Sequence, residues 1–193
     1  MNDFPWPLEK PDVRPHVDGW NSDENLSLFN QHLGPSTRVI VELGVWLGQS
    51  TLEFLRLARE STIVCVDHWQ GSEEHQTHDG CAAELPALRE TFLANVWEYR
   101  SRVVVISDTT TAGLKIINDH RISPDFIYVD ASHRFEDVKA DVEMADYLFP
   151  NAILAGDDFD WEGVRRALES CAIHRKLYRG RRCWWFERTG HER

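Results

Sequence analysis

The chain has 193 residues, a length typical of one domain with a substantial core. Its formal net charge of -11 opposes association with phosphate backbones, so we expect no nucleic-acid partner. No stretch approaches the roughly 20 apolar residues that span a membrane, and the N-terminus lacks the apolar segment of a signal peptide. We therefore expect a cytoplasmic protein without a membrane partner, whose four cysteines are reduced thiols.

The N-terminal segment, residues 1–35, is expected to be an arm and a helix that serve as a lid or a dimer contact. It is rich in proline and in aromatic residues, among them Trp20, which predicts an extended arm that packs its aromatic side chains. A helix is predicted over residues 22–33, with Ser22 as a candidate for its N-cap. The remaining residues, 36–193, are predicted to form the main domain.

From residue 38 onwards, apolar strands alternate with amphipathic helices. The predicted strands cover residues 38–43, 62–67, 102–107, 125–130 and 152–158, and the predicted helices cover 49–60, 84–100, 110–120, 135–149 and 161–171. Nearly continuous apolar strands separated by helices are typical of a parallel sheet covered on both faces. Two further strand-like runs about Gly180 predict a terminal antiparallel hairpin. The sequence thus predicts an α/β fold with a doubly wound, mostly parallel seven-stranded sheet.

Acidic or small polar residues stand at the ends of the five predicted parallel strands. In an open parallel sheet, ligands bind beyond the carboxyl ends of the strands, so these residues are candidates for a binding site. Each residue alone could also be a helix cap, because aspartate is common at the N-cap position. What indicates a binding site is that such residues follow all five strands. The residues are Glu42, Gly44, Asp67, Ser107, Asp108, Asp130, Asp157 and Asp158.

The first strand runs into a turn that contains Gly44 and Gly48. The dinucleotide pattern G-x-G-x-x-G is not met, because Trp46 and Gln49 occupy the positions that need glycine. The phosphate-binding loop G-x-x-x-x-G-K-[ST] is absent as well, since no lysine follows the second glycine. A cofactor with an adenosine, an amino-acid end and a positive charge in place of phosphates fits better.

The run Glu42-Leu43-Gly44-Val45-Trp46-Leu47-Gly48 resembles the E/D-x-G-x-x-x-G motif of class I methyltransferases, which use S-adenosylmethionine. The resemblance extends over about residues 36–188 and implies a Rossmann-like sheet. It implies that the glycine turn contacts the methionine end of the cofactor and that Asp67 accepts the ribose hydroxyls. By position, the implied cofactor-binding residues are Glu42, Gly44, Gly48, Asp67, His68, Ser107, Asp108 and Asp130.

The segment from Phe126 to Asp158 resembles the branch that groups cephalosporin-hydroxylase-type and macrocin-type O-methyltransferases. In that branch, I-D-G-D-H-S-Y-E-G-V-x-x-D is followed by D-D. The resemblance implies that Asp130, Asp157 and Asp158 bind Mg2+ or another divalent cation, for which carboxylate oxygens are suitable ligands. The simpler alternative is that these aspartates cap a helix and hold a loop. The implied function is O-methylation of a hydroxyl on a small-molecule acceptor, a sugar or a secondary metabolite.

Ser132 stands where this branch commonly has an aspartate, and a serine hydroxyl is a poor general base. The neighbouring His133 is therefore the candidate base, and Asp130 is the second candidate catalytic residue. Three hypotheses stay open: a metal-assisted O-methyltransferase, a metal-independent methyltransferase with His133 as the base, and a non-catalytic domain that binds the S-adenosyl ligand as an interaction module.

Residues 68–83 are expected to be a polar loop over the acceptor pocket. The spacing of His75 and His78 does not suit zinc, although either could contact substrate. Trp69 is expected either to stack on adenine or to pack in the core. A homodimer is expected only from the frequency of two-fold assemblies. A cluster of basic residues near the C-terminus is expected either to receive an anionic group or to form a solvated face. The cluster consists of Arg175, Lys176, Arg179, Arg181 and Arg182.

Overall fold

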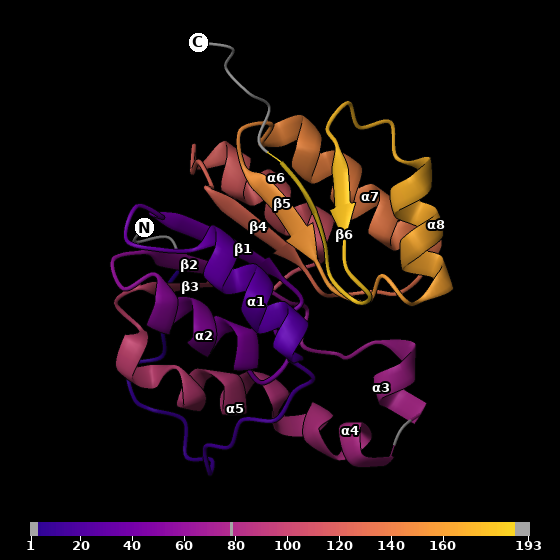
Figure 1. Ribbon diagram of the computed structural model, residues 1–193. Coiled ribbons are helices and arrows are strands. Elements are labelled where there is room, and N and C mark those ends of the chain that lie inside the picture. Colours follow the sequence, from indigo (N-terminus) through magenta and orange to yellow (C-terminus); the bar gives the residue numbers. More distant parts are fainter. Residues whose placement is uncertain (1–3, 78, 188–193) are drawn as a thin grey trace.

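The computed structural model describes residues 4–77 and 79–187. A seven-stranded sheet in the order β3-β2-β1-β4-β5-β7-β6 forms its centre (Figure 1). The strands are β1 (Val39–Leu43), β2 (Thr62–Val66), β3 (Val103–Ile106), β4 (Phe126–Val129), β5 (Ile153–Gly156), β6 (Leu177–Arg179) and β7 (Trp184–Phe186). The strands β1 to β5 pair in parallel, and β7 is antiparallel to both β5 and β6. The predicted mostly parallel sheet with a terminal hairpin is confirmed.

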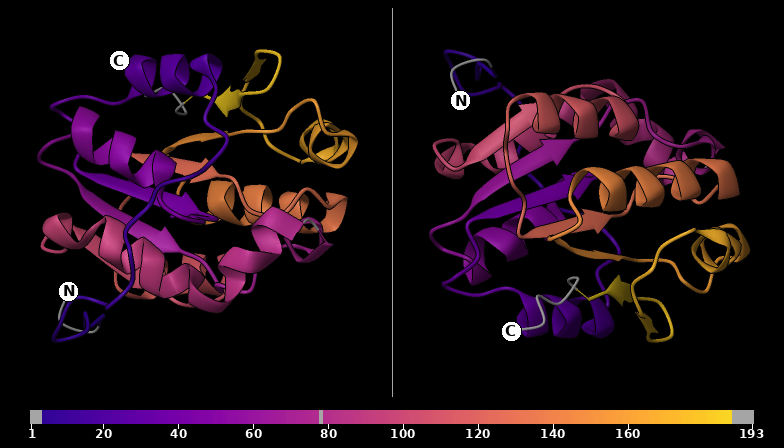
Figure 2. Two further views of the ribbon diagram at one scale, coloured as in Figure 1. Left: turned by 90° about the horizontal axis from the view of Figure 1, so that it is seen from below. Right: turned by 90° about the horizontal axis from the view of Figure 1, so that it is seen from above.

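Helices cover both faces of the sheet (Figure 2). On one face lie α1 (Asp23–His32), α2 (Gln49–Leu57) and α5 (Leu88–Asn95), and on the other lie α6 (Thr110–Asp119), α7 (Phe135–Leu148) and α8 (Glu162–Ser170). Because successive side chains of a strand point to opposite faces, the neighbours Ile40 and Val41 of β1 belong to different apolar clusters. Both faces of the sheet are therefore closed, and ligands have access only at its ends.

The order of the strands places a crevice at one end of the sheet. The chain proceeds from β1 to β2 and β3 in one direction, and then from β4 to β5 on the other side of β1. Such a reversal is the topological switch point, where parallel sheets bind their ligands beyond the carboxyl ends of the strands. Residues that follow β1 and β4 are thereby brought together.

The segment between β2 and β3 differs from the prediction. Two short helices, α3 (Glu73–Thr77) and α4 (Asp79–Glu84), occupy the expected loop. The single helix expected over residues 84–100 is wrong, because η1 (Leu85–Ala87), α5 and η2 (Trp97–Tyr99) take its place. Pro86 accounts for the first interruption, since proline has no N–H to donate and its ring obstructs the preceding turn.

The N-terminal arm is attached to the sheet and to α2 and α5 by side-chain hydrogen bonds. The indole N–H of Trp6 donates to the carbonyl of Val103 at 2.9 Å, and Asn95 Nδ2 donates to the carbonyl of His16 at 2.7 Å. Near the end of the arm, the backbone N–H of Asn21 donates to Oε1 of Gln49, the first residue of α2, at 2.9 Å. The arm therefore reaches the carboxyl end of the sheet just before α1 begins.

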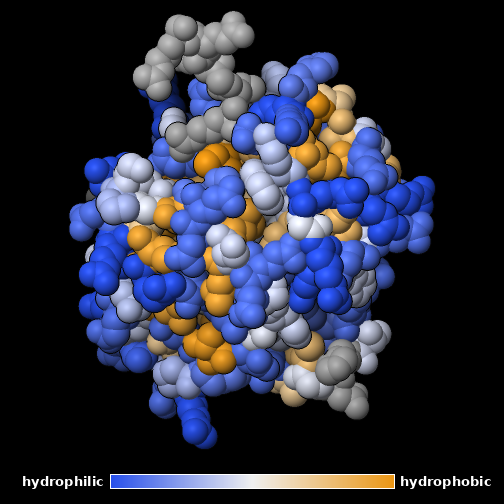
Figure 3. All heavy atoms as spheres, in the orientation of Figure 1, coloured by the Kyte–Doolittle hydropathy of each residue, from blue (hydrophilic) through white to orange (hydrophobic). Residues whose placement is uncertain are grey.

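The surface is mostly hydrophilic on the face shown in Figure 3, where hydrophobic residues form scattered patches. Among the described residues, no helix combines the length and the apolar character needed to cross a membrane.

The start of α1 generates a first prediction. The N–H of Asn25 donates to Ser22 Oγ at 3.3 Å, and the N–H of Ser22 donates to Asn25 Oδ1 at 2.7 Å, which together form a capping box. Replacing Ser22 by alanine should lower the free energy of unfolding by about 1 kcal/mol, measured by urea denaturation. Ser27→Ala, at an exposed position of the same helix, is the control and should change it by less than about 0.5 kcal/mol. Equal losses in both variants would contradict the role of the cap.

Candidate active site

The turn after β1 brings its backbone against the end of β4. Gly44 and Gly48 have left-handed conformations, with φ of 82° and 85°. A Cβ on Gly44 would overlap the carbonyl oxygen of Asp130, and a Cβ on Gly48 would lie 2.9 Å from the Phe92 ring. Only glycine allows both the conformation and the approach. Trp46, between them, also has a positive φ of 50°, which is rare for an aromatic residue and occurs mainly where a site requires it.

Glu42 is a buried carboxylate with an unsatisfied oxygen. Its Oε2 accepts a hydrogen bond from Thr51 Oγ1, but its Oε1 has no hydrogen-bond partner among the described residues. Burial raises the pKa of Glu42 to about 8, although hydrogen bonds from Ser50 and Thr51 oppose this shift. A buried polar atom without a partner is rare in a folded protein and indicates a missing partner, such as a ligand or an ordered water.

A cavity of about 510 Å³ lies beyond the carboxyl ends of β1, β2 and β4. This volume is within the range of small-molecule sites. Of the predicted cofactor-binding residues, Gly44, Asp67, His68, Asp108 and Asp130 line the cavity. Glu42, Gly48 and Ser107 do not line it. Glu42 lies in β1, Gly48 is the N-cap of α2, and Ser107 follows β3 directly.

Asp67 is held in place by backbone amides. Its Oδ2 accepts hydrogen bonds from the N–H groups of Val45 at 2.9 Å and Trp46 at 3.3 Å, and its Oδ1 accepts from the N–H of Trp69 at 2.7 Å. The carboxylate thus joins the glycine turn to the end of β2. Since each carboxylate oxygen accepts about two hydrogen bonds, Asp67 retains capacity for ligand hydroxyls.

Trp69 belongs to the core and does not line the cavity. Its side chain is only 9% exposed and packs on Phe92, with ring centroids 5.0 Å apart. The indole N–H donates to Ser107 Oγ at 3.1 Å, and Arg89 Nε donates to the same oxygen at 3.2 Å. Of the two alternatives for Trp69, stacking on adenine is wrong and packing in the core is confirmed. The role of Ser107 at the adenine stays a prediction.

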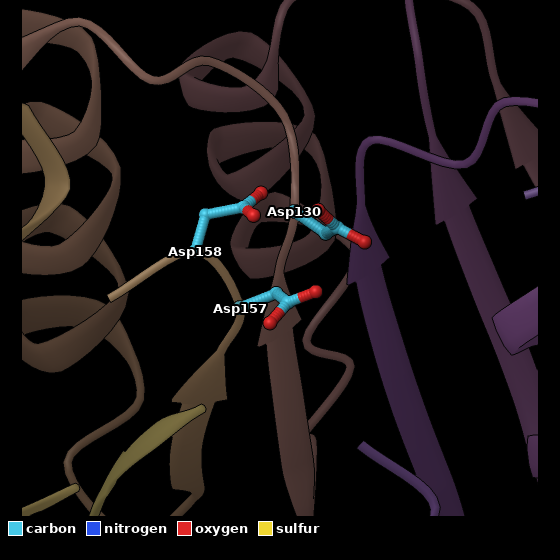
Figure 4. A group of neighbouring side chains, drawn as sticks. All are labelled: Asp130, Asp157 and Asp158. Atoms are coloured by element: carbon cyan, nitrogen blue, oxygen red, sulfur yellow. The ribbon is translucent and has the colours of Figure 1, made fainter. Parts of the chain in front are cut away.

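Three aspartates meet at the ends of β4 and β5 (Figure 4). One oxygen from each of Asp130, Asp157 and Asp158 lies within 4.8 Å of the others. Burial and the neighbouring carboxylates raise the pKa of Asp130 well above its usual range, and the same two causes raise the pKa of Asp157. The pKa of Asp158 is lowered: burial opposes this, but hydrogen bonds from His133 and Arg182 outweigh it. We call these three residues the aspartate cluster.

Among the described residues, the guanidinium of Arg182, the imidazole of His133 and the thiol of Cys183 contact the aspartate cluster. Arg182 Nη2 donates to Asp157 Oδ2 at 3.1 Å and to Asp158 Oδ1 at 2.9 Å. His133 Nε2 lies 2.9 Å from Asp158 Oδ2. Burial alone would lower the pKa of His133, but the hydrogen bond to Asp158 and the charges of Asp158, Glu74 and Asp157 raise it overall.

The basic cluster near the C-terminus divides into two kinds of residue. Arg175 is buried and forms an ion pair with Asp146 at 2.5 Å, and Arg182 is bound to the aspartate cluster. Only Lys176, Arg179 and Arg181 are exposed. The basic cluster was expected to be either an anion site or a solvated face. Both expectations are wrong for Arg175 and Arg182, because each forms an ion pair inside the protein.

Sequence reasoning missed the residues that support the aspartate cluster from α1. The carboxylate of Glu24 accepts hydrogen bonds from the backbone N–H groups of Arg182 and Cys183, at 3.2 and 3.3 Å. Asn25 donates from Nδ2 to the hydroxyl of the buried Tyr128 at 2.8 Å, and its side chain opposes the rise in the pKa of Asp157. Both residues occupy the first turn of a helix, where Glu and Asn are ordinary, so the sequence held no signal for this role.

A second cavity, of about 330 Å³, lies directly over the aspartate cluster. The two cavities share lining residues, among them Gly44, Trp46, His75 and Asp130, so they adjoin at the glycine turn. Trp20 of the N-terminal arm and Trp161 also line the second cavity. The position of Trp20 agrees with the expectation that the N-terminal arm forms a lid, whereas no sequence pattern indicated Trp161; both side chains are unusually exposed for tryptophan.

The remaining predicted residues are found as follows. Ser132 donates to Asp137 Oδ2 at 2.8 Å and does not touch the aspartate cluster. Within the described part of the chain, the only group of potential metal ligands is the aspartate cluster, and His75 and Cys81 are not part of it. His78 lies outside the described residues, as does the side chain of Asp79.

The buried carboxylate of Glu42 generates a second prediction. Because burial raises its pKa from 4.5 to about 8, the folded chain keeps a proton that the unfolded chain releases, and this group's contribution to stability is lost as the pH rises through that window. Glu42→Gln cannot ionise. Between pH 5 and pH 8, the free energy of unfolding of the variant relative to the wild type should therefore rise by about 3 kcal/mol, measured by urea denaturation. Glu60→Gln, at an exposed position, should show no such change, and a difference that is constant with pH for Glu42→Gln would contradict the assignment.

Known proteins share this fold. A proposed rRNA methylase from Clostridium thermocellum superposes with a TM-score of 0.60 at 12% identity, over 90% of this chain and 100% of that one. An O-methyltransferase from Bacillus cereus in complex with S-adenosylhomocysteine gives 0.55 at 21% identity, over 93% and 84%. MycE, a methyltransferase of mycinamycin biosynthesis, gives 0.56 at 13% identity, over 83% of this chain and 47% of that one.

No curated protein matches the sequence significantly. The sequence does match the methyltransferase domain family over residues 41–159, a stretch that begins in β1 and ends just after the aspartate cluster. It contains the glycine turn, Asp67 and all three aspartates. The chain therefore belongs to the methyltransferase domain family and is a class I S-adenosylmethionine-dependent methyltransferase.

Proposed function

We propose that this methyltransferase transfers the methyl group of S-adenosylmethionine to a hydroxyl of a small-molecule acceptor, and that a divalent cation held by the aspartate cluster assists the transfer. The observation that carries the proposal is that two cavities adjoin at Asp130, which lines both. A cofactor in the larger cavity and an acceptor in the smaller one would meet beside this residue.

The larger cavity suits the cofactor in charge and in hydrogen bonding. Its lining contains many more carboxylates than basic groups, which favours the positively charged sulfonium and ammonium groups of the cofactor. Asp67 is fixed by three backbone amides in an orientation from which it can accept ribose hydroxyls. Bound there, the cofactor supplies an electrophilic methyl group.

The aspartate cluster suits a divalent cation. Its three carboxylates have one permanently charged partner, Arg182, so negative charge remains in excess. A set of oxygen ligands is the kind that Mg2+ prefers, and the similar structure of MycE is described as a complex with Mg. A cation bound there supplies positive charge that favours ionisation of an acceptor hydroxyl.

We propose that His133 accepts the proton of that hydroxyl. Asp158 binds its Nε2, and its ring stacks on Trp161 with centroids 4.1 Å apart, so the imidazole is fixed in orientation. Its Nδ1 is buried, has no hydrogen-bond partner among the described residues and lies 3.9 Å from Glu74 Oε1, so a small side-chain movement is needed before an acceptor can reach it. S-adenosylmethionine bound in the larger cavity would supply the methyl group to the acceptor oxygen and keep the electron pair of the broken carbon–sulfur bond on sulfur, and His133 would take up the hydroxyl proton.

A metal-independent transfer by the same residues is the second candidate. It is favoured by Arg182, which already supplies a positive charge to Asp157 and Asp158 at 3.1 and 2.9 Å. In that case His133 alone removes the proton and the arginine stabilises the cluster. The two candidates differ in their response to a chelator.

A third prediction tests the role of the metal. Transfer of a labelled methyl group from S-adenosylmethionine to a panel of catechols and glycosides should be lost with EDTA and restored by excess Mg2+. Asp157→Asn should lower the rate at least about 100-fold, because it removes a charged ligand from the cluster. Asp160→Asn, at an exposed position three residues away, is the matched control and should keep the wild-type rate. Transfer that persists in EDTA supports the metal-independent candidate. Binding of S-adenosylhomocysteine without transfer to any member of the panel would contradict both.

A further inference from the structure

The smaller cavity has two kinds of lining that together restrict what it can bind. One is a set of tryptophans, and the other is a concentration of negative charge. Its volume of about 330 Å³ is at the lower end of the range for small-molecule sites, and it lies over the aspartate cluster. Under the proposed function, on which this inference rests, this is where the acceptor binds.

Trp20 and Trp161 form exposed aromatic surfaces in this cavity. They are 52% and 45% exposed, whereas most large apolar side chains of the described chain are buried. Trp20 stacks on His75 with an interplanar angle of 11°, and Trp161 stacks on His133 with an angle of 19°. Each indole is thus fixed by a histidine and retains free surface. Tryptophan faces of this kind bind the apolar face of a ring, either aromatic or saccharide.

The charge of the cavity is strongly negative. Among the described residues that line it, the carboxylates of Asp18, Glu74, Asp130, Asp157 and Asp158 face a single guanidinium, that of Arg182. The arginine is already bound to two of these carboxylates, so it is not free to receive a phosphate or a carboxylate from a ligand. When a divalent cation is bound and all five carboxylates are ionised, negative charge exceeds positive charge even if His133 is protonated. An anionic acceptor would therefore be repelled, and a cationic one attracted.

We infer that the acceptor is a hydroxylated ring compound without negative charge, neutral or cationic, whose ring packs on Trp20 and Trp161 while a hydroxyl faces Asp130. Acceptors that would have to place a phosphate or carboxylate group inside this cavity are disfavoured. Trp20 and Trp161 are specificity-determining residues, one from the N-terminal arm and one from the segment after β5.

Two sets of probes test whether the cavity disfavours anionic acceptors. Within each set the ring type is the same, and the three members are cationic, neutral and anionic. The catechol set is dopamine, 4-methylcatechol and 3,4-dihydroxybenzoate. The glycoside set is methyl glucosaminide, methyl glucoside and methyl glucuronide. Affinities are measured by calorimetry on the full chain saturated with S-adenosylhomocysteine and Mg2+. In at least one set, the cationic and neutral members should bind at least tenfold more tightly than the anionic member, and the set that binds identifies the ring as aromatic or saccharide.

Variants test the aromatic walls. Trp20→Ala and Trp161→Ala should each weaken binding of the best probe by about three- to tenfold, and Trp161→Phe should retain most of it. The affinity for S-adenosylhomocysteine should not change in Trp20→Ala or Trp161→Ala. Tyr147→Ala is the matched control, because this tyrosine is 83% exposed on α7 and lines neither cavity. It should leave both affinities unchanged.

The outcomes separate this inference from the function on which it rests. If S-adenosylhomocysteine does not bind the wild type, the proposed function fails and the inference fails with it. If it binds but the anionic probes bind as tightly as the others, or no probe of either set binds, the inference alone is overturned. If the probe affinity is unchanged in both Trp20→Ala and Trp161→Ala, the acceptor ring does not pack on these two side chains, and their role as specificity-determining residues is overturned.

Discussion

The whole site depends on one electrostatic constraint, the placement of three carboxylates within 4.8 Å of one another at the end of the sheet. Burial and mutual repulsion disfavour their ionised forms, as the raised pKa values of Asp130 and Asp157 show. Such a cluster is stable only if some of its carboxyl groups are protonated or if positive charge compensates them. The surrounding structure provides part of that charge through Arg182 and His133, and a divalent cation would provide the rest.

The compensating groups come from parts of the chain outside the parallel core. Arg182 lies in the turn of the β6–β7 hairpin, and Glu24 of α1 holds the backbone of that turn through hydrogen bonds. The same helix provides Asn25, and the arm before it provides Trp20. The N-terminal segment is therefore built into the site, and the smaller cavity is lined by residues from both the N-terminal arm and the C-terminal hairpin.

The sequence was sufficient for the sheet and for the residues at its strand ends, because both follow from local patterns. Apolar runs define β1 to β5, and parallel strands bring their carboxyl ends to one edge, so Asp67, Asp130 and Asp157 could be placed near one another. The glycine that the E/D-x-G-x-x-x-G motif requires at position 44 has a direct physical reason, since a Cβ at this position would overlap the backbone at Asp130.

The contacts between distant segments could not be predicted in this way. Whether Trp69 packs in the core or reaches the cofactor depends on the position of Phe92, and whether Arg182 is solvated depends on the hairpin that carries it to Asp157. Pro86 was a sequence signal that the helix after residue 84 is interrupted. The prediction of one continuous helix followed the amphipathic pattern instead and missed this signal. Local patterns define elements, whereas side-chain partners are set by tertiary packing.

The most direct test of the account is a calorimetric titration of S-adenosylhomocysteine into the purified protein, with Asp67→Ala and Asp119→Ala as a matched pair and NAD as a control ligand. We expect saturable binding by the wild type and by Asp119→Ala, whose substituted residue is exposed at the end of α6, and none of NAD. Asp67→Ala should bind at least about tenfold more weakly, because it loses the carboxylate that we propose accepts the ribose hydroxyls. No binding by the wild type, or equal binding by both variants, would contradict the placement of the cofactor in the larger cavity.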